Sequence, residues 1–233
     1  MDYIRKEVAR MILRINGDIV PNEYKEYYSS SSLECTCPRD VHDALETLPE
    51  GDRLQVKINS CGGDVLAGQE IYAELRARSD VNIEVESMAA SAASIIAMAG
   101  PSTISPIGMI MIHNASTSGA AGNKHEMQKT AEVLDTYDNA LASAYIEKTG
   151  MDRAEIMRMM DTETWLTAQR AVELGFIDSI SQAASSVSNS VYGLKVTDDM
   201  IAQYNAHKAE EAKKAQLKSD ILADLDKFGA KEV

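Results

Sequence analysis

Hydrophobic and polar positions along residues 41–112 follow two alternating spacings. Three runs have apolar or small side chains at the spacing of one helix face: 41–48, 65–78 and 89–99. Four runs alternate apolar and polar side chains or are short and apolar, as strands are: 54–58, 81–85, 103–104 and 109–112. Because these strands and helices follow one another at short intervals, we predict an α/β fold with mostly parallel strands.

The N-terminal part of the chain has a weaker pattern. Residues 10–20 favour β structure, and Asn16-Gly17 is expected to interrupt them with a turn. Residues 22–38 are polar, with serine at every position from Ser29 to Ser32, and they predict a loop.

A long helix is predicted over residues 124–148. Its apolar positions recur at helical intervals: Met127, Ala131, Leu134, Leu141 and Tyr145. Such a stripe packs against the core or another subunit, and we expect it to lie in a subunit interface. Gly150 ends this helix, and two shorter helices are expected at 152–160 and 167–174.

The composition changes after Ile180. Residues 181–190 are rich in Ser and Ala and predict a linker, and 207–218 consist mainly of Ala, Glu and Lys. The apolar residues around and beyond them form one narrow helical stripe: Leu217, Ile221, Leu225 and Phe228. We expect one domain at 1–180 and a helical tail at 181–233, which is either a solvated helix or a docking segment.

Composition and charge are those of a soluble globular domain, with 45% hydrophobic and 25% charged residues among 233. The formal charge of −13 repels phosphate backbones, and without a basic patch nucleic acid is not an expected partner. The longest weakly polar run, 88–104, is shorter than the ~20 apolar residues of a membrane-spanning helix. Because residues 1–6 lack the apolar segment of a secretory signal, we expect a cytoplasmic protein without membrane contact.

The three cysteines are too few for a disulfide framework. Cys35 and Cys37 stand one residue apart, closer than the paired ligands of a zinc knuckle, and there is no second pair. We therefore expect reduced thiols, and neither a metal nor a cofactor.

Two polar residues at strand ends are candidates for catalysis. Ser91 stands where a strand meets a helix of small residues, so helix amides favour negative charge beside its hydroxyl. His113 ends an apolar strand, whereas the other three histidines, at 42, 125 and 207, stand in polar helical contexts. Each candidate also has a structural explanation, as a helix N-cap for Ser91 and as a hydrogen-bonded structural residue for His113.

Two further segments complete the set of candidates. Asp161 is able to orient a histidine, or it caps a helix or a turn. Gly62 and Gly63 follow a strand, where glycine leaves backbone N–H groups free for an oxyanion or a peptide. Acyl transfer needs an activated hydroxyl, a proton shuttle and an oxyanion cradle, and the chain has candidates for all three.

In this order, the four segments resemble the Clp protease proteolytic subunit family, whose members are serine peptidases with a crotonase-like fold. The matching motifs are Asn59–Gly63, Ala90–Ala93, Ala99-Gly100, Met111–His113, Asp161-Thr162 and Ala168–Asp178. The resemblance extends from about Ile12 to Ile180, although Cys61 replaces the proline of the family's glycine loop and Ala92-Ala93 replace Met-Gly. It implies repeated strand–strand–helix units with a protruding long handle helix.

The resemblance also implies roles for individual residues. Ser91 would be the nucleophile, His113 the general base and Asp161 the group that orients the imidazole. Backbone groups of three residues would bind the oxyanion and the substrate: Gly62, Gly63 and Ala92. Family members act on protein substrates as homo-oligomers, so a heptameric ring or stacked rings are expected.

The segments at 89–100 and 159–165 further resemble the Clp-related head maturation proteases of tailed phages. This implies cleavage of capsid or scaffold proteins inside a bacterial host cell, without an obligatory ATPase. Three alternatives stay open: a general Clp proteolytic subunit that works with an ATPase unfoldase, a crotonase-type acyl-CoA enzyme, and an inactive shell protein. The acyl-CoA enzyme would use carboxylates and leave Ser91 and His113 unexplained, and the presence of all three triad candidates argues against an inactive shell.

Overall fold

The computed structural model describes three stretches of the chain: residues 10–181, 201–214 and 216. They belong to two compact units, 1–193 and 194–233. Within the second unit, residues 201–214 form a helix in which Lys214 and Glu210 make an ion pair of 2.8 Å. The two partners are one helical turn apart, the spacing at which side chains on a helix meet.

Two predictions for the tail concern residues outside these stretches. The Ser- and Ala-rich linker lies there from residue 182 on, and the stripe from Leu217 to Phe228 lies there as well. A domain boundary after residue 180 therefore stays a prediction. Within the described stretches, we find no helix that is both long and apolar enough to cross a membrane.

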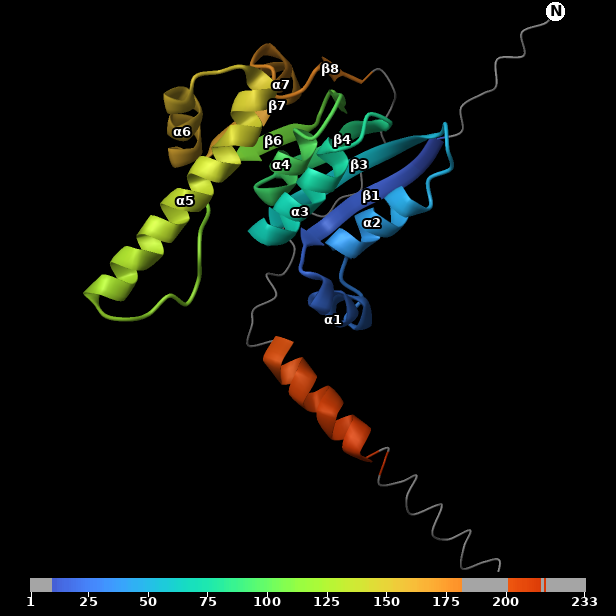
Figure 1. Ribbon diagram of the computed structural model, residues 1–233, viewed down its shortest axis with the longest axis vertical. Helices are drawn as coiled ribbons and strands as arrows, with labels where there is room; N and C mark the ends of the chain where they lie inside the picture. Colours follow the sequence, from blue (N-terminus) through green and yellow to red (C-terminus); the bar gives the residue numbers. More distant parts are fainter. Residues whose placement is uncertain (1–9, 182–200, 215, 217–233) are drawn as a thin grey trace, which may run out of the picture. The chain divides into compact units, whose positions relative to one another are not determined.

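One branched sheet forms the frame of the first unit (Figure 1). Its strands are β1 Arg10–Ile19, β2 Cys35–Thr36, β3 Arg53–Gly63, β4 Val81–Ala90, β5 Ser102–Ile104, β6 Met109–Ile112, β7 Thr164–Thr167 and β8 Ser179–Ile180. They follow the order β2-β1-β3-β4-β5-β8, while β6 pairs with β4 and β7 pairs with β6. Every pair is parallel except β6–β7, so the predicted α/β fold with mostly parallel strands is confirmed.

Strand β4 contacts two different neighbours along one edge. Its first half, at Ile83–Val85, pairs with β5, and its last residues pair with β6 in the register Ala89↔Ile110 and Ala90↔Met111. Ser91 follows β4 directly. The fork in the sheet therefore brings Ser91 next to the end of β6.

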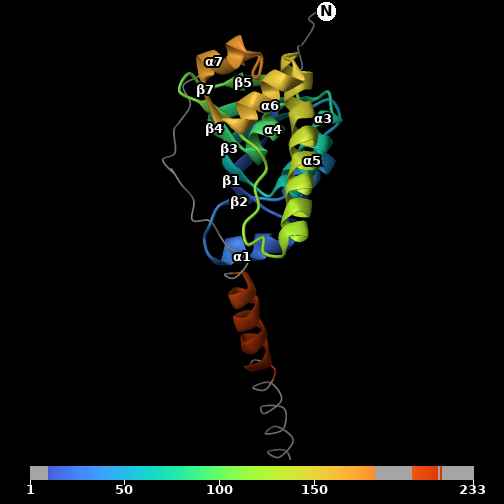
Figure 2. The same ribbon diagram turned by 90° about the vertical axis from the view of Figure 1, so that its left-hand side faces the viewer.

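Helices surround this sheet and extend from it. They are a short 3-10 helix at Asn22–Tyr24 and the α-helices α1 Lys25–Ser30, α2 Pro38–Glu46, α3 Val65–Arg76, α4 Ala92–Ala97, α5 Lys124–Thr149, α6 Arg153–Asp161 and α7 Ala168–Glu173. Helix α4 packs against β3, β4 and α3. The N-terminal half of α5 projects from the sheet in Figure 1, and Figure 2 views the helix from the side on which it lies.

The core lies between the sheet and the helices that cover it. Ile58 of β3, Val85 of β4, Ile71 of α3 and Ile96 of α4 are fully buried there. Burial of each such aliphatic side chain contributes about 1.5–3 kcal/mol to stability. The alternation that predicted β3 and β4 thus corresponds to the face that packs on α3 and α4.

Both ends of α5 follow the signals in its sequence. At the start, the Asn123 side chain accepts hydrogen bonds from the His125 and Glu126 amides at 2.9 and 3.2 Å. At the end, Gly150 adopts a left-handed conformation with φ 70°. An Asx cap and a left-handed glycine are the usual devices that end a helix in these positions, so the predicted extent is confirmed within two residues.

The expected subunit interface along the whole α5 stripe is wrong for its C-terminal half. Leu141 and Tyr145 are only 5% and 1% exposed in the single chain, and the Tyr145 ring lies 5.8 Å from the Phe176 ring. Met127, by contrast, is 42% exposed, and Leu134 is partly exposed. One helical stripe thus has two environments, because α5 leaves the body of the unit part-way along its length.

Two further expectations for the N-terminal part are wrong. Strand β1 continues through Asn16-Gly17 with a register shift, and Gly17 is at φ 67°. The polar segment 22–38 contains α1 and β2 rather than only a loop. Tyr28 of α1 is buried and donates a hydrogen bond to Asp18 at 2.9 Å, a tertiary contact that polarity along the chain does not reveal.

Candidate active site

Ser91 has a backbone conformation that is rare outside glycine. At the junction of β4 and α4, its φ is 53° and its ψ is −126°. Its N–H donates to the Met111 carbonyl at 2.9 Å, and its carbonyl accepts from the Ser94 N–H at 2.9 Å. Such a conformation costs on the order of 1–3 kcal/mol and persists only where the surroundings hold it, typically at functional sites.

Glycines allow other backbone segments to approach this junction closely. A Cβ atom on Gly62 would lie 2.7 Å from the Ala90 carbonyl oxygen and 2.7 Å from the Ser91 Cβ. A Cβ atom on Gly68 of α3 would lie 2.9 Å from the Ala92 Cβ. Gly62 was predicted from its place after a strand, whereas Gly68 was not, because its only signal in the sequence is a glycine inside a helical pattern.

The Ser91 hydroxyl and the His113 imidazole are hydrogen-bonded. The distance from Ser91 Oγ to His113 Nε2 is 2.8 Å, and both residues are partly exposed. The register between β4 and β6 creates this contact, because it places Ala90 beside Met111. With Nε2 unprotonated, the imidazole can accept the hydroxyl proton, which is the arrangement of an activated nucleophile.

Asp161 lies near this pair but is not hydrogen-bonded to His113. Its Oδ1 atom accepts a hydrogen bond of 2.9 Å from the Asn114 side chain. Among the described residues, Ser91 is the hydrogen-bond partner of the His113 ring. The structure therefore brings Ser91 and His113 into contact and joins Asp161 to the residue after His113.

A buried carboxylate that was not among the predicted site residues lies on α5. Asp138 is 5% exposed, and it accepts a hydrogen bond of 2.6 Å from the Ala115 N–H. Burial raises the pKa of Asp138 despite this amide, the negative charges of Asp135 and Asp161 act in the same direction, and His113 opposes them. Its signal in the sequence is an acidic residue inside the apolar stripe, between Leu134 and Leu141.

A third carboxylate follows from the pairing of β6 with β7. Ile112 pairs with Thr164, and continuing this antiparallel register by one residue would place Glu163 opposite His113. Glu163 has φ 47°, and its carboxylate accepts a hydrogen bond of 3.1 Å from the Trp165 indole. Strand β7 was not predicted, so neither was this juxtaposition.

The three predicted oxyanion donors do not all lie beside Ser91. Ala92 opens α4, and the first amides of a helix have no intrahelical acceptor. The Gly62 N–H donates to Ser60 Oγ at 3.1 Å, whereas a Cβ atom on Gly63 would meet the Ile19 carbonyl oxygen at 2.1 Å. Ala92 and Gly62 thus adjoin Ser91, and Gly63 faces β1.

The thiols have the character of ordinary cysteines. Burial raises the pKa of Cys35 to about 11, and it also raises that of Cys37. Free thiols are therefore the expected form at neutral pH. In the described part of the chain, no group of three or more His, Cys, Asp or Glu side chains is placed to hold a metal ion.

The comparison with known families agrees with this geometry. Residues 39–184, more than half of the chain, match the Clp protease family. The chain belongs to the Clp protease family. It is a serine endopeptidase of the Clp type, and its fold is the crotonase-like fold of that family.

Several known Clp proteins are similar to this family member. The chain is 30% identical over 151 residues to ATP-dependent Clp protease proteolytic subunit 1 of Protochlamydia amoebophila, covering 63% of this chain and 73% of that protein. It is 31% identical over 140 residues to the ATP-dependent Clp protease proteolytic subunit of Bacteroides fragilis, covering 58% and 67%. The ATP-dependent Clp protease proteolytic subunit 1 of Chlamydia abortus is 30% identical over 141 residues, covering 58% of this chain and 73% of that protein.

Asp138→Asn is expected to stabilise this Clp family member at neutral pH. The amide keeps an oxygen for the Ala115 N–H but cannot ionise, whereas burial raises the pKa of the Asp138 carboxyl. When folding raises the pKa of a group, that group stabilises the folded state below its unfolded-state pKa. This stabilisation is lost as the pH rises through the folded-state pKa. The advantage of the variant should therefore grow from acid to neutral pH.

Thermal unfolding midpoints of both proteins at several pH values measure this effect. A wild type that is the more stable protein at neutral pH would contradict it. That result would mean that the attraction between Asp138 and His113 outweighs the burial of the carboxylate.

Proposed function

We propose that Ser91 is the nucleophile and His113 the general base of this Clp-type endopeptidase. The hydrogen bond of 2.8 Å between Ser91 Oγ and His113 Nε2 carries the proposal. The strained backbone at Ser91 supports it, since such strain concentrates at functional sites. The neighbours of Ser91 in the sequence, Ala90 and Ala92, also support it, because their short side chains add little bulk beside the hydroxyl.

The geometry suggests the following sequence of steps. His113 Nε2 takes the hydroxyl proton while Ser91 Oγ attacks the carbonyl carbon of the scissile peptide. The Ala92 N–H stabilises the oxyanion, and the Gly62 N–H joins it by releasing Ser60 Oγ. The imidazolium of His113 then protonates the leaving amine, and water hydrolyses the acyl-enzyme with His113 again as the base.

We further propose that Asp161 stabilises the imidazolium of His113. Its carboxylate acts through charge and through Asn114, which it holds by a hydrogen bond of 2.9 Å. The competing carboxylates are Asp138, on whose pKa the charge of His113 acts, and Glu163, which an extended β6–β7 register would place opposite His113. Comparison of Asp161→Asn, Asp138→Asn and Glu163→Gln separates the three, because the true partner is the one whose loss lowers kcat most at unchanged KM.

His113→Gln is expected to remove most of the peptidase activity, by about 10³-fold or more. A fluorophosphonate, which reacts only with an activated serine, should label Ser91 in the wild type and hardly label the variant. The matched control is His125→Gln on the projecting part of α5, which should be labelled at the wild-type rate. Labelling of His113→Gln at that same rate would refute the general-base assignment.

The family match already argues against the other two candidate functions, and the same labelling experiment tests them directly. A crotonase-type acyl-CoA enzyme or an inactive shell protein has no activated serine and would remain unlabelled. Rapid labelling of Ser91 together with hydrolysis of a peptide substrate would exclude both.

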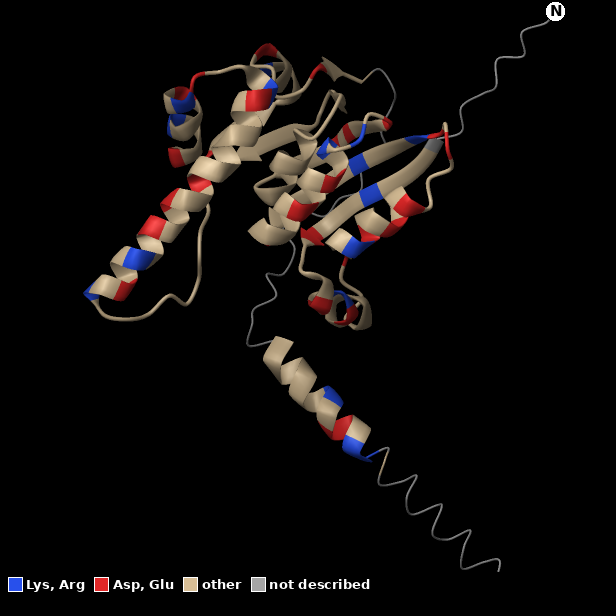
Figure 3. Ribbon diagram, in the orientation of Figure 1, with Lys and Arg blue, Asp and Glu red and all other residues tan. Residues whose placement is uncertain are grey.

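We propose that the projecting half of α5 packs against other subunits of a ring or of stacked rings, with a heptamer as the expected ring. Met127 is 42% exposed there, and charged residues of both signs surround the apolar positions (Figure 3). Homo-oligomeric assembly is a property of the family, and an exposed apolar stripe on a helix requires a cover.

Met127→Asp combined with Leu134→Asp is expected to lower the particle mass, since a buried unpaired charge is costly. Activity should fall with the particle mass. Thr136→Asp adds a similar charge to another face of α5 and should leave both unchanged. Light scattering measures the mass, and a double variant with the wild-type mass would show that this stripe is not in an interface.

For the substrate, we propose capsid or scaffold proteins cleaved during phage head assembly in the cytoplasm of a bacterial host. The resemblance of segments 89–100 and 159–165 to head maturation proteases supports this role. The names of the relatives, ATP-dependent Clp protease proteolytic subunits, favour the second candidate, a subunit that serves an ATPase unfoldase. Mass spectrometry after incubation with capsid or scaffold protein, without ATP, distinguishes the two roles by the presence or absence of cleavage.

A further inference from the structure

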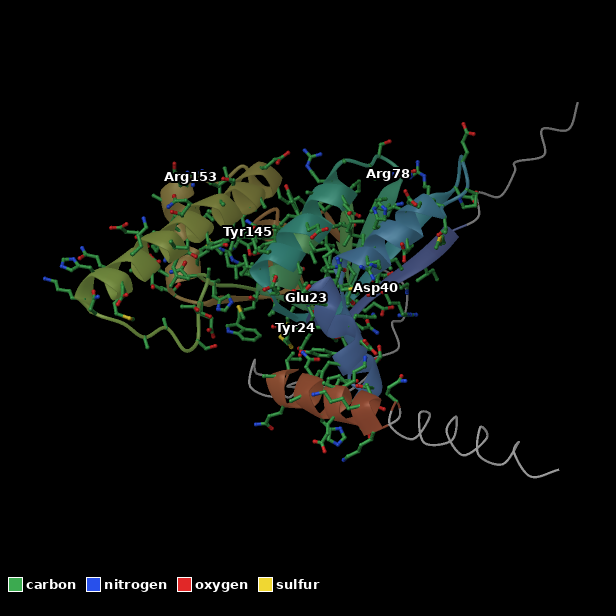
Figure 4. All side chains as sticks on the ribbon, turned by 60° about the horizontal axis from the view of Figure 1, so that its bottom comes forward. Glu23, Tyr24, Asp40, Arg78, Tyr145 and Arg153 are labelled. Carbon is green, nitrogen blue, oxygen red and sulfur yellow. The ribbon has the colours of Figure 1, made fainter. Side chains whose placement is uncertain are left out.

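A buried chain of hydrogen bonds connects α5 to Ser91. The Tyr145 hydroxyl lies 2.8 Å from Ser94 Oγ, which lies 2.6 Å from the Ser91 carbonyl oxygen. Tyr145 is 1% exposed and Ser94 is fully buried; Figure 4 labels Tyr145 on α5. Because a carbonyl oxygen can only accept, the Ser94 hydroxyl donates to Ser91 and the Tyr145 hydroxyl donates to Ser94.

Helix α4 does not require these hydroxyl hydrogen bonds for its own first turn. The Ser94 amide already donates to the Ser91 carbonyl at 2.9 Å, as expected in the first turn of a helix. The Ser94 hydroxyl adds a second donor to the same oxygen and itself accepts from the Tyr145 hydroxyl, and both hydroxyls must be desolvated for this. Alanine and phenylalanine would fill nearly the same space without burying a hydroxyl.

The Ser91 carbonyl oxygen, at the end of these hydrogen bonds, belongs to the peptide group that carries a proposed oxyanion donor. The Ser91 carbonyl and the Ala92 N–H are parts of one planar trans peptide group, so they point in opposite directions. Holding the oxygen therefore orients the N–H. Hydrogen bonds to the oxygen also polarise the peptide and strengthen its N–H as a donor.

We infer that Tyr145 and Ser94 are positioning residues that aim the Ala92 N–H at the oxyanion of the reaction. The inference rests on the proposed function of Ser91. It explains why the Ser91 carbonyl has two donors, while the Ser91 N–H, on the preceding peptide, is already held by the Met111 carbonyl. Burial raises the pKa of the Tyr145 hydroxyl, which therefore remains a donor over the whole neutral range.

Three variants test the positioning role: Ser94→Ala, Tyr145→Phe and the double variant. Ser94→Ala should lower kcat about tenfold with KM nearly unchanged, because it removes the second donor to the Ser91 carbonyl. Tyr145→Phe should lower kcat about threefold, because Ser94 still donates but is held by one contact fewer. Tyr137→Phe on the same helix is the matched control and should keep the wild-type kcat.

The unfolding midpoints of these variants distinguish a positioning role of Ser94 and Tyr145 from a merely structural one. Ser94→Ala leaves the Tyr145 hydroxyl buried without a partner, so its unfolding midpoint should fall. The double variant removes that hydroxyl and should recover most of the midpoint, yet its kcat should stay as low as that of Ser94→Ala. A kcat that recovers together with the midpoint would overturn the inference.

Labelling of the wild type distinguishes a failure of the proposed function from a failure of this inference. If a fluorophosphonate labels Ser91 but all three variants keep the wild-type kcat, the proposed function stands and the positioning role is refuted. If the wild type is not labelled and Ser91→Ala remains active, the proposed function fails, and the positioning role fails with it.

Discussion

Ser91→Ala is expected to abolish peptide hydrolysis, with a loss of about 10⁴-fold or more in kcat. The physical reason is that the hydroxyl bonded to His113 Nε2 is the proposed nucleophile, and no other described serine hydroxyl is bonded to that ring. The fold should be unaffected, because the side chain is small and partly exposed. Hydrolysis of a fluorogenic peptide and circular dichroism measure the two properties.

Two further observations complete the test of Ser91. Ser29→Ala in α1 removes an exposed hydroxyl and should keep the wild-type rate. Fluorophosphonate labelling should disappear in Ser91→Ala alone. Turnover by that variant near the wild-type rate would show that another group is the nucleophile.

Gly62→Ala is expected to lower kcat by about 100-fold, because displacement of a reactive group by about 1 Å has an effect of that size. The added methyl group would lie 2.7 Å from both the Ala90 carbonyl oxygen and the Ser91 Cβ, and 2.9 Å from the Ala92 nitrogen. These atoms are backbone or the start of a short side chain, so the Ser91 junction itself must move. Overpacking of this kind also costs about 1–3 kcal/mol of stability.

A matched control separates the clash from backbone strain. Gly51 has φ 88°, close to the 98° of Gly62, but a Cβ atom there would meet nothing within 4 Å. Gly51→Ala should therefore lower the unfolding midpoint slightly and leave kcat unchanged. If Gly62→Ala retains the wild-type kcat, the close approach of Gly62 is not needed for catalysis.

Local patterns along the chain predicted most of the elements that carry the site. The alternation at 54–58 and 81–85 corresponds to β3 and β4, and the helical spacing at 65–78 corresponds to α3. These elements are predictable because one face of each is buried and the other is not, a difference that the order of residues expresses directly. Boundaries were less accurate: β4 continues to Ala90, so the predicted helix 89–99 shortens to α4.

Segments whose structure depends on distant partners were not predicted. Helix α1 is anchored by Tyr28, which reaches Asp18, and by Lys25, whose amine lies 2.7 Å from Asp40. Strand β7 forms because it pairs with the edge of β6. It was not predicted because Thr164–Thr167 has too few residues for a clear alternation. A polar or very short segment has no periodicity of its own, so its structure follows from its neighbours.

The sequence alone determined the fold class, most of the elements that carry the site and the two residues that meet there. Ser91 and His113 were identified from strand ends and from the family resemblance, and the structure places their side-chain atoms 2.8 Å apart. The tertiary structure decided which carboxylates surround them and which side chains hold the Ser91 peptide. Asp138 and Tyr145 come from α5, far along the chain, and they reach the site only because the C-terminal half of that helix packs onto the body of the unit. Sequence patterns report whether a residue is buried, whereas the packing of distant elements decides what it is buried against.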